Sequence, residues 1–196
     1  MEKENAINRM KKYFGEDIPR INHALRVLYY GEKILNMEQV EQPFIRCVVK
    51  MACIFHDIGI KESERKYHSA AAKYQELEGP PVAREIMLDI LTRPDILERA
   101  CYLIGHHHTQ KAVDGLDFQI LWEADYLVNV EEGWLKVDAS KGKEILSQHF
   151  HTTAGAAFFQ EIEMIRKSLS DLGRIFCEST LQNPCHHFSG DDGIGL

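Results

Sequence analysis

Two adjacent polar residues, His56 and Asp57, end the most apolar segment of the sequence. The segment reads MACIFHDIGIK over residues 51–61, so a glycine follows the pair at position 59. A buried carboxylate is costly unless it is paired or coordinates a metal ion. Imidazole and carboxylate groups are also common ligands of divalent transition metals. The pair therefore requires either a partner group or a metal ion.

Two other polar residues interrupt apolar helical patterns. Asp125 continues the stripe formed by Phe118, Leu121 and Trp122, and His23 lies one turn before Val27 on an inward-looking face. Taken singly, a core histidine is commonly satisfied by a hydrogen bond, and a buried aspartate commonly caps a helix or pairs with a cation. One metal site would explain all four polar intrusions together, and the spacing alone leaves both explanations open.

The elements that must position these residues are helices. Apolar residues recur at helical spacing along most of the chain, and no convincing strand alternation occurs, so we predict an all-α bundle in a single domain. A polar loop is expected at KESERKY, Gly79 is expected to end one helix, and Pro80-Pro81 is expected to start another. The predicted helices are residues 3–14, 18–35, 42–56, 68–79, 80–91, 94–108, 117–132 and 153–177.

Composition restricts the class of protein. The chain has 196 residues and a net charge of −7, which argues against a domain built to bind nucleic acid, since such domains are usually basic. No apolar stretch is long enough to span a bilayer, and the charged start lacks the apolar core of a signal peptide. The five cysteines form an odd count without CxxC spacing. We expect a cytoplasmic, reduced protein with no membrane partner, and a homo-oligomer stays open.

The order of these residues resembles a known family. His23 in INHALRV, His56-Asp57 in ACIFHDIGIK and Asp125 in LWEADYL are similar to the motifs of the HD-domain superfamily of metal-dependent phosphohydrolases. The resemblance covers residues 18–131 and implies a helical domain over residues 1–178. The tail at 179–196 matches nothing in the family and is expected to be poorly ordered.

The resemblance implies a divalent metal ion (Mn, Fe, Co, Ni, Zn or Mg) held by His23, His56, Asp57 and Asp125. It also implies a small phosphorylated substrate, a phosphomonoester or a nucleotide, cleaved by metal-activated water. The alternatives are a di-iron oxygenase of the same fold, or a nucleotide-sensing module without catalysis. Members that hold two metals insert two further histidines between the doublet and the last aspartate.

Five further residues are candidates for the site. His68, His106 and His107 lie in the interval where a second metal or a phosphate would be bound, whereas His108 is expected to face solvent. Lys61 could stabilise charge on a phosphate, and a solvated loop lysine is an equal alternative. Arg26, beyond His23, could clamp a phosphate, and an ion pair to a neighbouring helix is at least as well supported.

Overall fold

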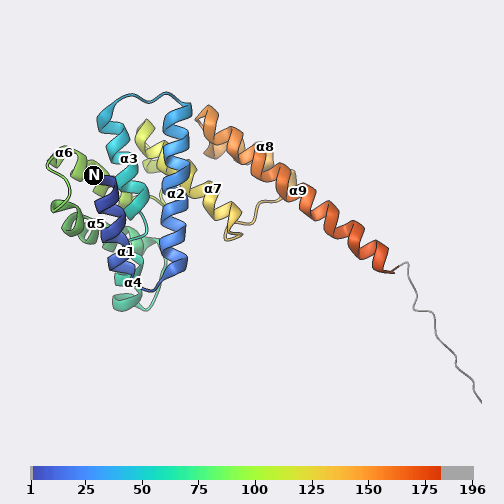
Figure 1. Ribbon diagram of the computed structural model, residues 1–196, viewed down its shortest axis with the longest axis horizontal. Helices are drawn as coiled ribbons and strands as arrows, with labels where there is room; N and C mark the ends of the chain where they lie inside the picture. The colour runs from blue at the N-terminus through green and yellow to red at the C-terminus, as the bar shows by residue number, and fades with distance from the viewer. Residues whose placement is uncertain (1, 182–196) are drawn as a thin grey trace, which may run out of the picture. The chain divides into compact units, whose positions relative to one another are not determined.

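The computed structural model describes residues 2–181 of the protein (Figure 1). These residues form helices and no β-strand, which confirms the all-α prediction. The chain divides into two compact units, Met1–Gln160 and Glu161–Leu196. Most of the tail predicted at 179–196 lies outside the described residues. The helices are α1 (Glu2–Phe14), α2 (Ile18–Met37), α3 (Pro43–Phe55), α4 (Ile60–Tyr67), α5 (Ala72–Leu88), α6 (Pro94–Ile104), α7 (Leu116–Glu131), α8 (Gly142–His149) and α9 (Thr153–Leu181), with short 3₁₀ turns η1 (Gln110–Ala112) and η2 (Ala139–Lys141).

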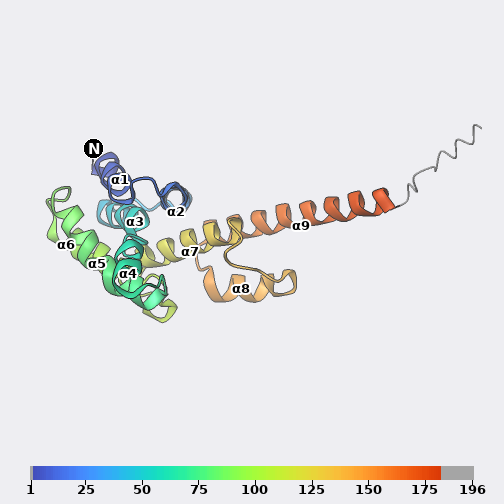
Figure 2. The same cartoon turned by 90° about the horizontal axis from the view of Figure 1, so that it is seen from below.

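Helix α3 forms the centre of the first unit. Figures 1 and 2 both place it between α6 and α2, and it also packs against α7. Its last residues, from Met51 to Phe55, are all buried. Helices α2, α3 and α7 contact one another pairwise, so polar side chains on their inner faces can meet at one point. Helices α2 and α7 and the turn directly after α3 carry the predicted metal ligands.

The turn that follows α3 is pressed against α5. A Cβ atom added at Gly59 would lie 2.5 Å from the carbonyl oxygen of Gln75 and 2.5 Å from the backbone nitrogen of Gly79. The backbones approach this closely because neither glycine carries a side chain. Helix α5 runs through Gly79, Pro80 and Pro81. The predictions that Gly79 ends one helix and that Pro80-Pro81 starts another were therefore wrong. Close tertiary packing outweighs the local breaker signals here.

The segment KESERKY was wrongly predicted as a loop. It forms most of α4, which has only Ile60 and Ser63 buried. The helix carries ion pairs at helical spacing, with Glu62 2.7 Å from Arg65 and 3.9 Å from Lys66. Pairs three and four residues apart stabilise a helix without any long apolar stripe, so a search for hydrophobic periodicity misses it.

The start of α9 is held by two acceptors from other elements, the buried Glu123 and the half-buried Glu38. Glu123 accepts hydrogen bonds from the backbone nitrogens of His151 at 2.6 Å and Thr152 at 2.9 Å. Glu38 accepts one from the nitrogen of Ala154 at 2.7 Å. The N–H group of Ala154 lies in the first turn of α9, where it has no partner within the helix, and His151 and Thr152 directly precede the helix. The two carboxylates therefore satisfy donors on both sides of its start. Glu123 thus has a structural role, away from the predicted metal ligands.

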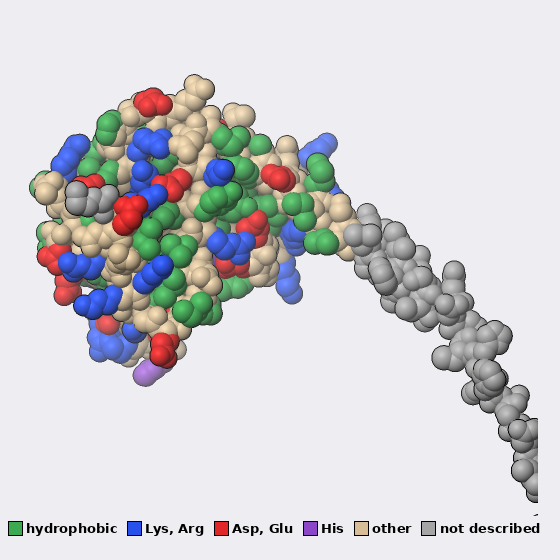
Figure 3. All heavy atoms as spheres, in the orientation of Figure 1, with side chains coloured by type: hydrophobic (Ala, Val, Ile, Leu, Met, Phe, Trp, Pro, Cys, Tyr) green, Lys and Arg blue, Asp and Glu red, His purple; other side chains and the backbone are tan. Residues whose placement is uncertain are grey.

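The surface of the first unit is charged and mixed. On the face shown in Figure 3, basic and acidic side chains are interspersed among the described residues. Ion pairs such as Arg20 with Glu64, at 2.6 Å, and Arg99 with Asp114, at 2.6 Å, are typical of this surface. Within residues 2–181, no helix has the length and apolar character needed to cross a membrane.

Candidate metal centre

The four predicted ligands converge between α2, the turn after α3, and α7. Nε2 of His23 lies 3.2 Å from Nε2 of His56, 3.2 Å from Oδ1 of Asp125 and 3.6 Å from Oδ2 of Asp57. Nε2 of His56 lies 3.4 Å from Oδ2 of Asp57 and 3.6 Å from Oδ1 of Asp125. His23, His56 and Asp57 are buried, and their ligand atoms lie within 4.8 Å of one another. Two imidazoles and two carboxylates form a donor set that suits a divalent metal ion.

Hydrogen bonds on the far side of each imidazole ring fix its orientation. His56 donates from Nδ1 to the carbonyl oxygen of Cys53 at 3.0 Å, and His23 donates from Nδ1 to Oε2 of Glu132 at 2.9 Å. With Nδ1 held in this way, Nε2 is the nitrogen that each ring offers to a metal ion once its proton is lost. A metal-binding histidine usually has such a partner for its other nitrogen. The sequence analysis missed Glu132, although it lies seven residues after Asp125 and hence on the same face of α7.

Arg26 is engaged by acidic side chains at the end of α7. Its guanidinium lies 3.1 Å from Oε1 of Glu132 and also pairs with Glu131. Arg26 therefore forms an ion pair between helices, the alternative to the predicted phosphate clamp. Through Glu132, Arg26 supports the orientation of His23 instead.

The charges of the cluster shift its pKa values strongly. Burial lowers the pKa of His23, but the hydrogen bond to Asp125 and the charges of Asp57 and Asp125 outweigh it and raise this pKa to about 9. Burial would raise the pKa of Asp57, but His56 and His107 hold it well below its usual range. The pKa of Asp125 is also lowered, because the hydrogen bond to His23 and the charge of His56 outweigh burial. Two ionised carboxylates therefore face rings that favour a positive charge, and a metal cation can replace that charge.

Asp57 also belongs to a second group that could hold a metal ion, together with His107 and His108. Oδ1 of Asp57 lies 3.4 Å from Nε2 of His107, while its Oδ2 faces the first group. His107 donates from Nδ1 to the carbonyl oxygen of Ile104 at 2.8 Å, and its buried Nε2 has no hydrogen-bond partner. An orphaned imidazole nitrogen aimed at an ionised carboxylate fits a metal ligand. The carboxylate of Asp57 is thus shared between two groups.

Three of the predicted residues are not brought to either group. The ring of His106 packs at a tilt against that of Tyr102, and His106 donates from Nδ1 to the carbonyl oxygen of Tyr102 at 2.7 Å. His68 is exposed and ends α4 with φ 53°. Lys61 donates to the carbonyl oxygen of Tyr13 at 2.9 Å. The helix before His106 ends at Ile104, and the tight turn after it selects His107 and His108 from the run of three histidines.

His108 is exposed, as expected, and is nevertheless a member of the second group. Its Nε2 lies 3.1 Å from Oε1 of Gln75 on α5. Asn129, which the sequence analysis also missed, donates from Nδ2 to Oδ1 of Asp125 at 2.9 Å. The first contact orients the ring of His108, and the second orients the carboxylate of Asp125.

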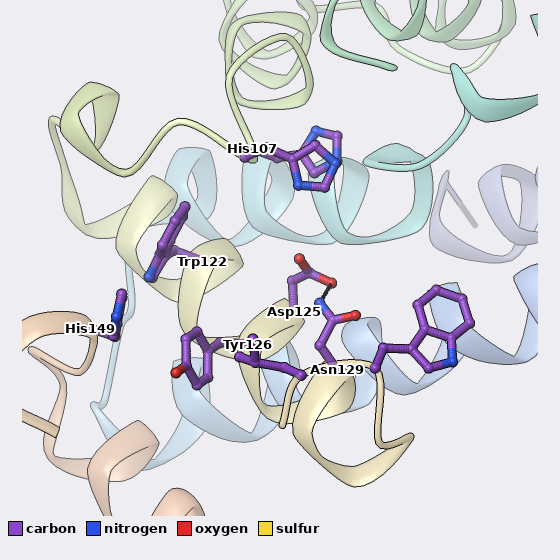
Figure 4. A pocket seen from close by; sticks show the side chains of 9 residues that line it. His107, Trp122, Asp125, Tyr126, Asn129 and His149 are labelled. Carbon is purple, nitrogen blue, oxygen red and sulfur yellow. Dashed lines mark hydrogen bonds between the residues drawn. The ribbon is translucent and has the colours of Figure 1, made fainter. Parts of the chain in front are cut away.

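A cavity of about 420 Å³ opens beside the cluster (Figure 4). Its volume lies within the range of small-molecule sites. Asp125, Asn129 and His107 line it on the cluster side, and Trp122 and His149 line it farther away. His149 ends α8 and is half-buried, with its ring against Trp122 and Tyr126 of α7.

The fold and the metal-capable centre agree with the comparisons with known proteins. The sequence matches the model of the HD domain over residues 20–178, so the chain belongs to the HD domain family. A solved structure described as a predicted HD superfamily hydrolase, from an uncultured Thermotogales bacterium, aligns with a TM-score of 0.61. The alignment has 18% identity and covers 89% of this chain and 91% of that one, a likeness that establishes the fold. No curated protein matches the sequence.

Proposed function

We propose that the protein is a metal-dependent phosphohydrolase that cleaves a small phosphomonoester. The observation that carries the proposal is the convergence of His23, His56, Asp57 and Asp125 beside a cavity of substrate size, which Asp125 lines. In this proposal the four side chains are the ligands of one divalent ion. Such an ion supplies an activated water and neutralises charge on the phosphate. The Thermotogales structure that aligns with this chain is described as a predicted HD superfamily hydrolase, which supports hydrolysis as the class of reaction.

The residues of the chain have separate tasks in this reaction. Glu132 and the carbonyl of Cys53 hold the two imidazoles with Nε2 toward the ion. Asn129 fixes Oδ1 of Asp125 through its amide. Asp57 presents Oδ2 to the first group and Oδ1 to His107, so it can bridge to a second ion or orient the attacking water. Lys61 has no part in the proposed reaction, because its ammonium group binds the backbone of Tyr13.

His107 and His108 are the residues that we propose for a second ion or for the phosphate. Each is within reach of Asp57, and the unpartnered Nε2 of His107 supplies a free ligand atom. A di-iron oxygenase would need both groups occupied, and of the histidines predicted for the second metal His68 lies exposed at the end of α4. A sensing module without catalysis would not require the intact set of four ligands. The phosphohydrolase needs only the first group, and it explains why all four ligands are present.

The test combines metal content with activity. Elemental analysis of the purified chain should find a divalent metal, and the loaded protein should release phosphate from a panel of phosphomonoesters. Asp57→Asn should lose both metal and activity. Asp89→Asn is the matched control, because Asp89 is an exposed carboxylate paired with Arg9. Metal binding without phosphate release from any ester would refute the proposal, and two irons per chain would favour the oxygenase.

A further inference from the structure

A tryptophan that follows α7 covers one face of His23. The ring of Trp134 lies parallel to the imidazole, with an interplanar angle of 5° and with centroids 5.5 Å apart. This separation lies within the range of favourable aromatic pairs. Trp134 is 64% exposed, whereas His23 is only 2% exposed. The indole therefore lies between a buried member of the metal-capable cluster and the solvent.

The turn after α7 holds Trp134 in this position. Gly133 has φ 77°, a left-handed backbone conformation that glycine adopts without steric cost. Its nitrogen donates to the carbonyl oxygen of Val130 at 3.2 Å, and the nitrogen of Leu135 donates to the carbonyl oxygen of Asn129 at 3.0 Å. The backbone is thus bonded to α7 on both sides of Trp134, so the place of the indole is set by the turn.

Side chains at the end of α7 already orient two of the candidate ligands within the plane of their hydrogen bonds. Glu132 accepts from Nδ1 of His23 at 2.9 Å, and Asn129 donates to Oδ1 of Asp125 at 2.9 Å. A hydrogen bond at the edge of an imidazole fixes a direction, but it leaves the ring plane free to rotate about that bond. A ring stacked on the face of the imidazole restrains this rotation. Trp134 thus supplies the restraint that Glu132 cannot.

Trp134 also lies between two cavities. It lines the cavity of about 420 Å³ beside the cluster, together with Asp125, and it lines a second cavity of about 610 Å³, together with Arg26 and Glu132. Without the indole, water would reach the face of the imidazole and the contact between His23 and Glu132. A hydrogen bond in a shielded site is stronger than the same bond in water. The indole therefore protects this contact.

The type of ring fits a histidine that binds a cation. An imidazole bound to a divalent ion carries part of its positive charge. Among aromatic side chains, tryptophan offers the most favourable face to a cation within about 6 Å of its centroid. The stack of Trp134 on His23 should therefore be stronger in the metal-bound protein than in the metal-free protein.

From these contacts we propose that Trp134 is a positioning residue of the metal centre. It holds the ring of His23 at the angle at which Nε2 faces the other ligands, and it keeps water from that ring and from its bond to Glu132. The consequence is slow release of a bound ion. This inference rests on the metal centre of the proposed function and is independent of the substrate.

The rate at which a bound ion leaves tests this role without any turnover. Protein loaded with Zn²⁺ is mixed with an excess of a colorimetric chelator, and release is followed by absorbance. Trp134→Ala should release the ion about three- to tenfold faster than wild type, as expected for the loss of one aromatic stack. Trp134→Phe keeps a ring against His23 and should release the ion nearly as slowly as wild type. Release from Trp134→Ala at the wild-type rate, or from Trp134→Phe as fast as from Trp134→Ala, overturns the proposal.

The matched control is Leu135→Ala, because Leu135 lies in the same turn, is half-buried and lines the first cavity. It should release the ion as wild type does. Release as fast as from Trp134→Ala would show that any loss of packing in the turn has this effect, and it would overturn the proposal. Thermal melting of the metal-free variants shows whether each one is folded.

Fluorescence tests the same contact with Trp134 in place. The chain has two tryptophans, so Trp122→Phe leaves Trp134 as the only one. Ni²⁺ and Co²⁺ quench tryptophan at short range, and either ion should quench this variant saturably. Adding Asp57→Asn, which removes a proposed ligand, should abolish the quenching. An unquenched Trp134 in protein that elemental analysis shows to be loaded overturns the proposal.

Metal binding and turnover together separate this inference from the proposed function. A protein that binds no divalent ion overturns both. Faster release from Trp134→Ala, without cleavage of any phosphomonoester by wild type, refutes the proposed function and leaves the role of Trp134 standing. Cleavage by wild type, with the same rate of release in both proteins, leaves the proposed function standing and overturns only the role of Trp134.

Discussion

The carboxylate of Glu132 lies 2.9 Å from Nδ1 of His23, on the side of the ring that faces away from the metal-capable cluster. Arg26 holds the other oxygen of the same carboxylate at 3.1 Å. This chain of contacts connects a partly exposed arginine on α2 with a buried histidine on the same helix, through the end of α7. It fixes the tautomer in which Nε2 of His23 can bind a metal ion.

Replacing Glu132 should therefore weaken metal binding without removing a ligand. We expect Glu132→Ala to lower the affinity for a divalent ion by about 10- to 100-fold, the usual effect of losing such a partner. Isothermal titration with Mn²⁺ or Zn²⁺ measures the change. Glu131→Ala is the matched control, because Glu131 contacts Arg26 and Tyr30 but is not a partner of His23. Equal losses in the two variants would contradict the assignment.

The run of three histidines should show a sharp difference between neighbours. His107→Ala removes the unpartnered Nε2 that faces Asp57, whereas His106→Ala removes a ring packed against that of Tyr102. We expect His107→Ala to lower metal occupancy or kcat by at least about tenfold and His106→Ala to leave both near wild type. Metal analysis and phosphate release on the two proteins measure this. A larger effect at His106 would show that the turn after α6 is arranged differently.

Metal binding should release protons at neutral pH. In the metal-free protein the pKa of His23 is raised to about 9, so at pH 7 its ring carries a proton that the metal must displace. The apparent affinity should therefore increase as the pH rises from 6 toward 9. Calorimetric titrations at pH 7 in buffers with different ionisation enthalpies should detect about one released proton per ion from this ring. The same heat in every buffer would contradict the prediction.

Gly59 should tolerate no side chain. Its hypothetical Cβ lies 2.5 Å from backbone atoms of Gln75 and Gly79, which cannot move as a side chain can. We expect Gly59→Ala to lower the free energy of unfolding by about 1–3 kcal/mol, as overpacking does. Urea denaturation of the chelator-treated protein separates this effect from metal loss. Gly142→Ala is the control, because nothing lies within 4 Å of its Cβ position and the change should stay within about 1 kcal/mol.

The sequence by itself was sufficient to predict most of the helices, though not α4 or α8, and the four converging side chains. Helical periodicity is a local signal, and His23, His56 and Asp125 each interrupt an apolar stripe that only an inward-facing residue can continue. The order of the motifs identified the family that the family model then confirmed. For the same reason, the charged helix α4 was predicted as a loop and helix α5 was predicted as two helices, since neither carries a clean local pattern.

Only the tertiary structure decided which neighbours of the ligands take part in the site. It selected His107 rather than His106, assigned Glu132 to His23, and brought His149 from α8 against α7. These relationships depend on the residue at which a turn ends and on how closely two distant stretches of backbone approach, as they do at Gly59 and Gly79. Sequence spacing determines the face of a helix on which a residue lies. Contacts between residues far apart in the chain are decided by the packing of the helices, which brings them within hydrogen-bonding distance.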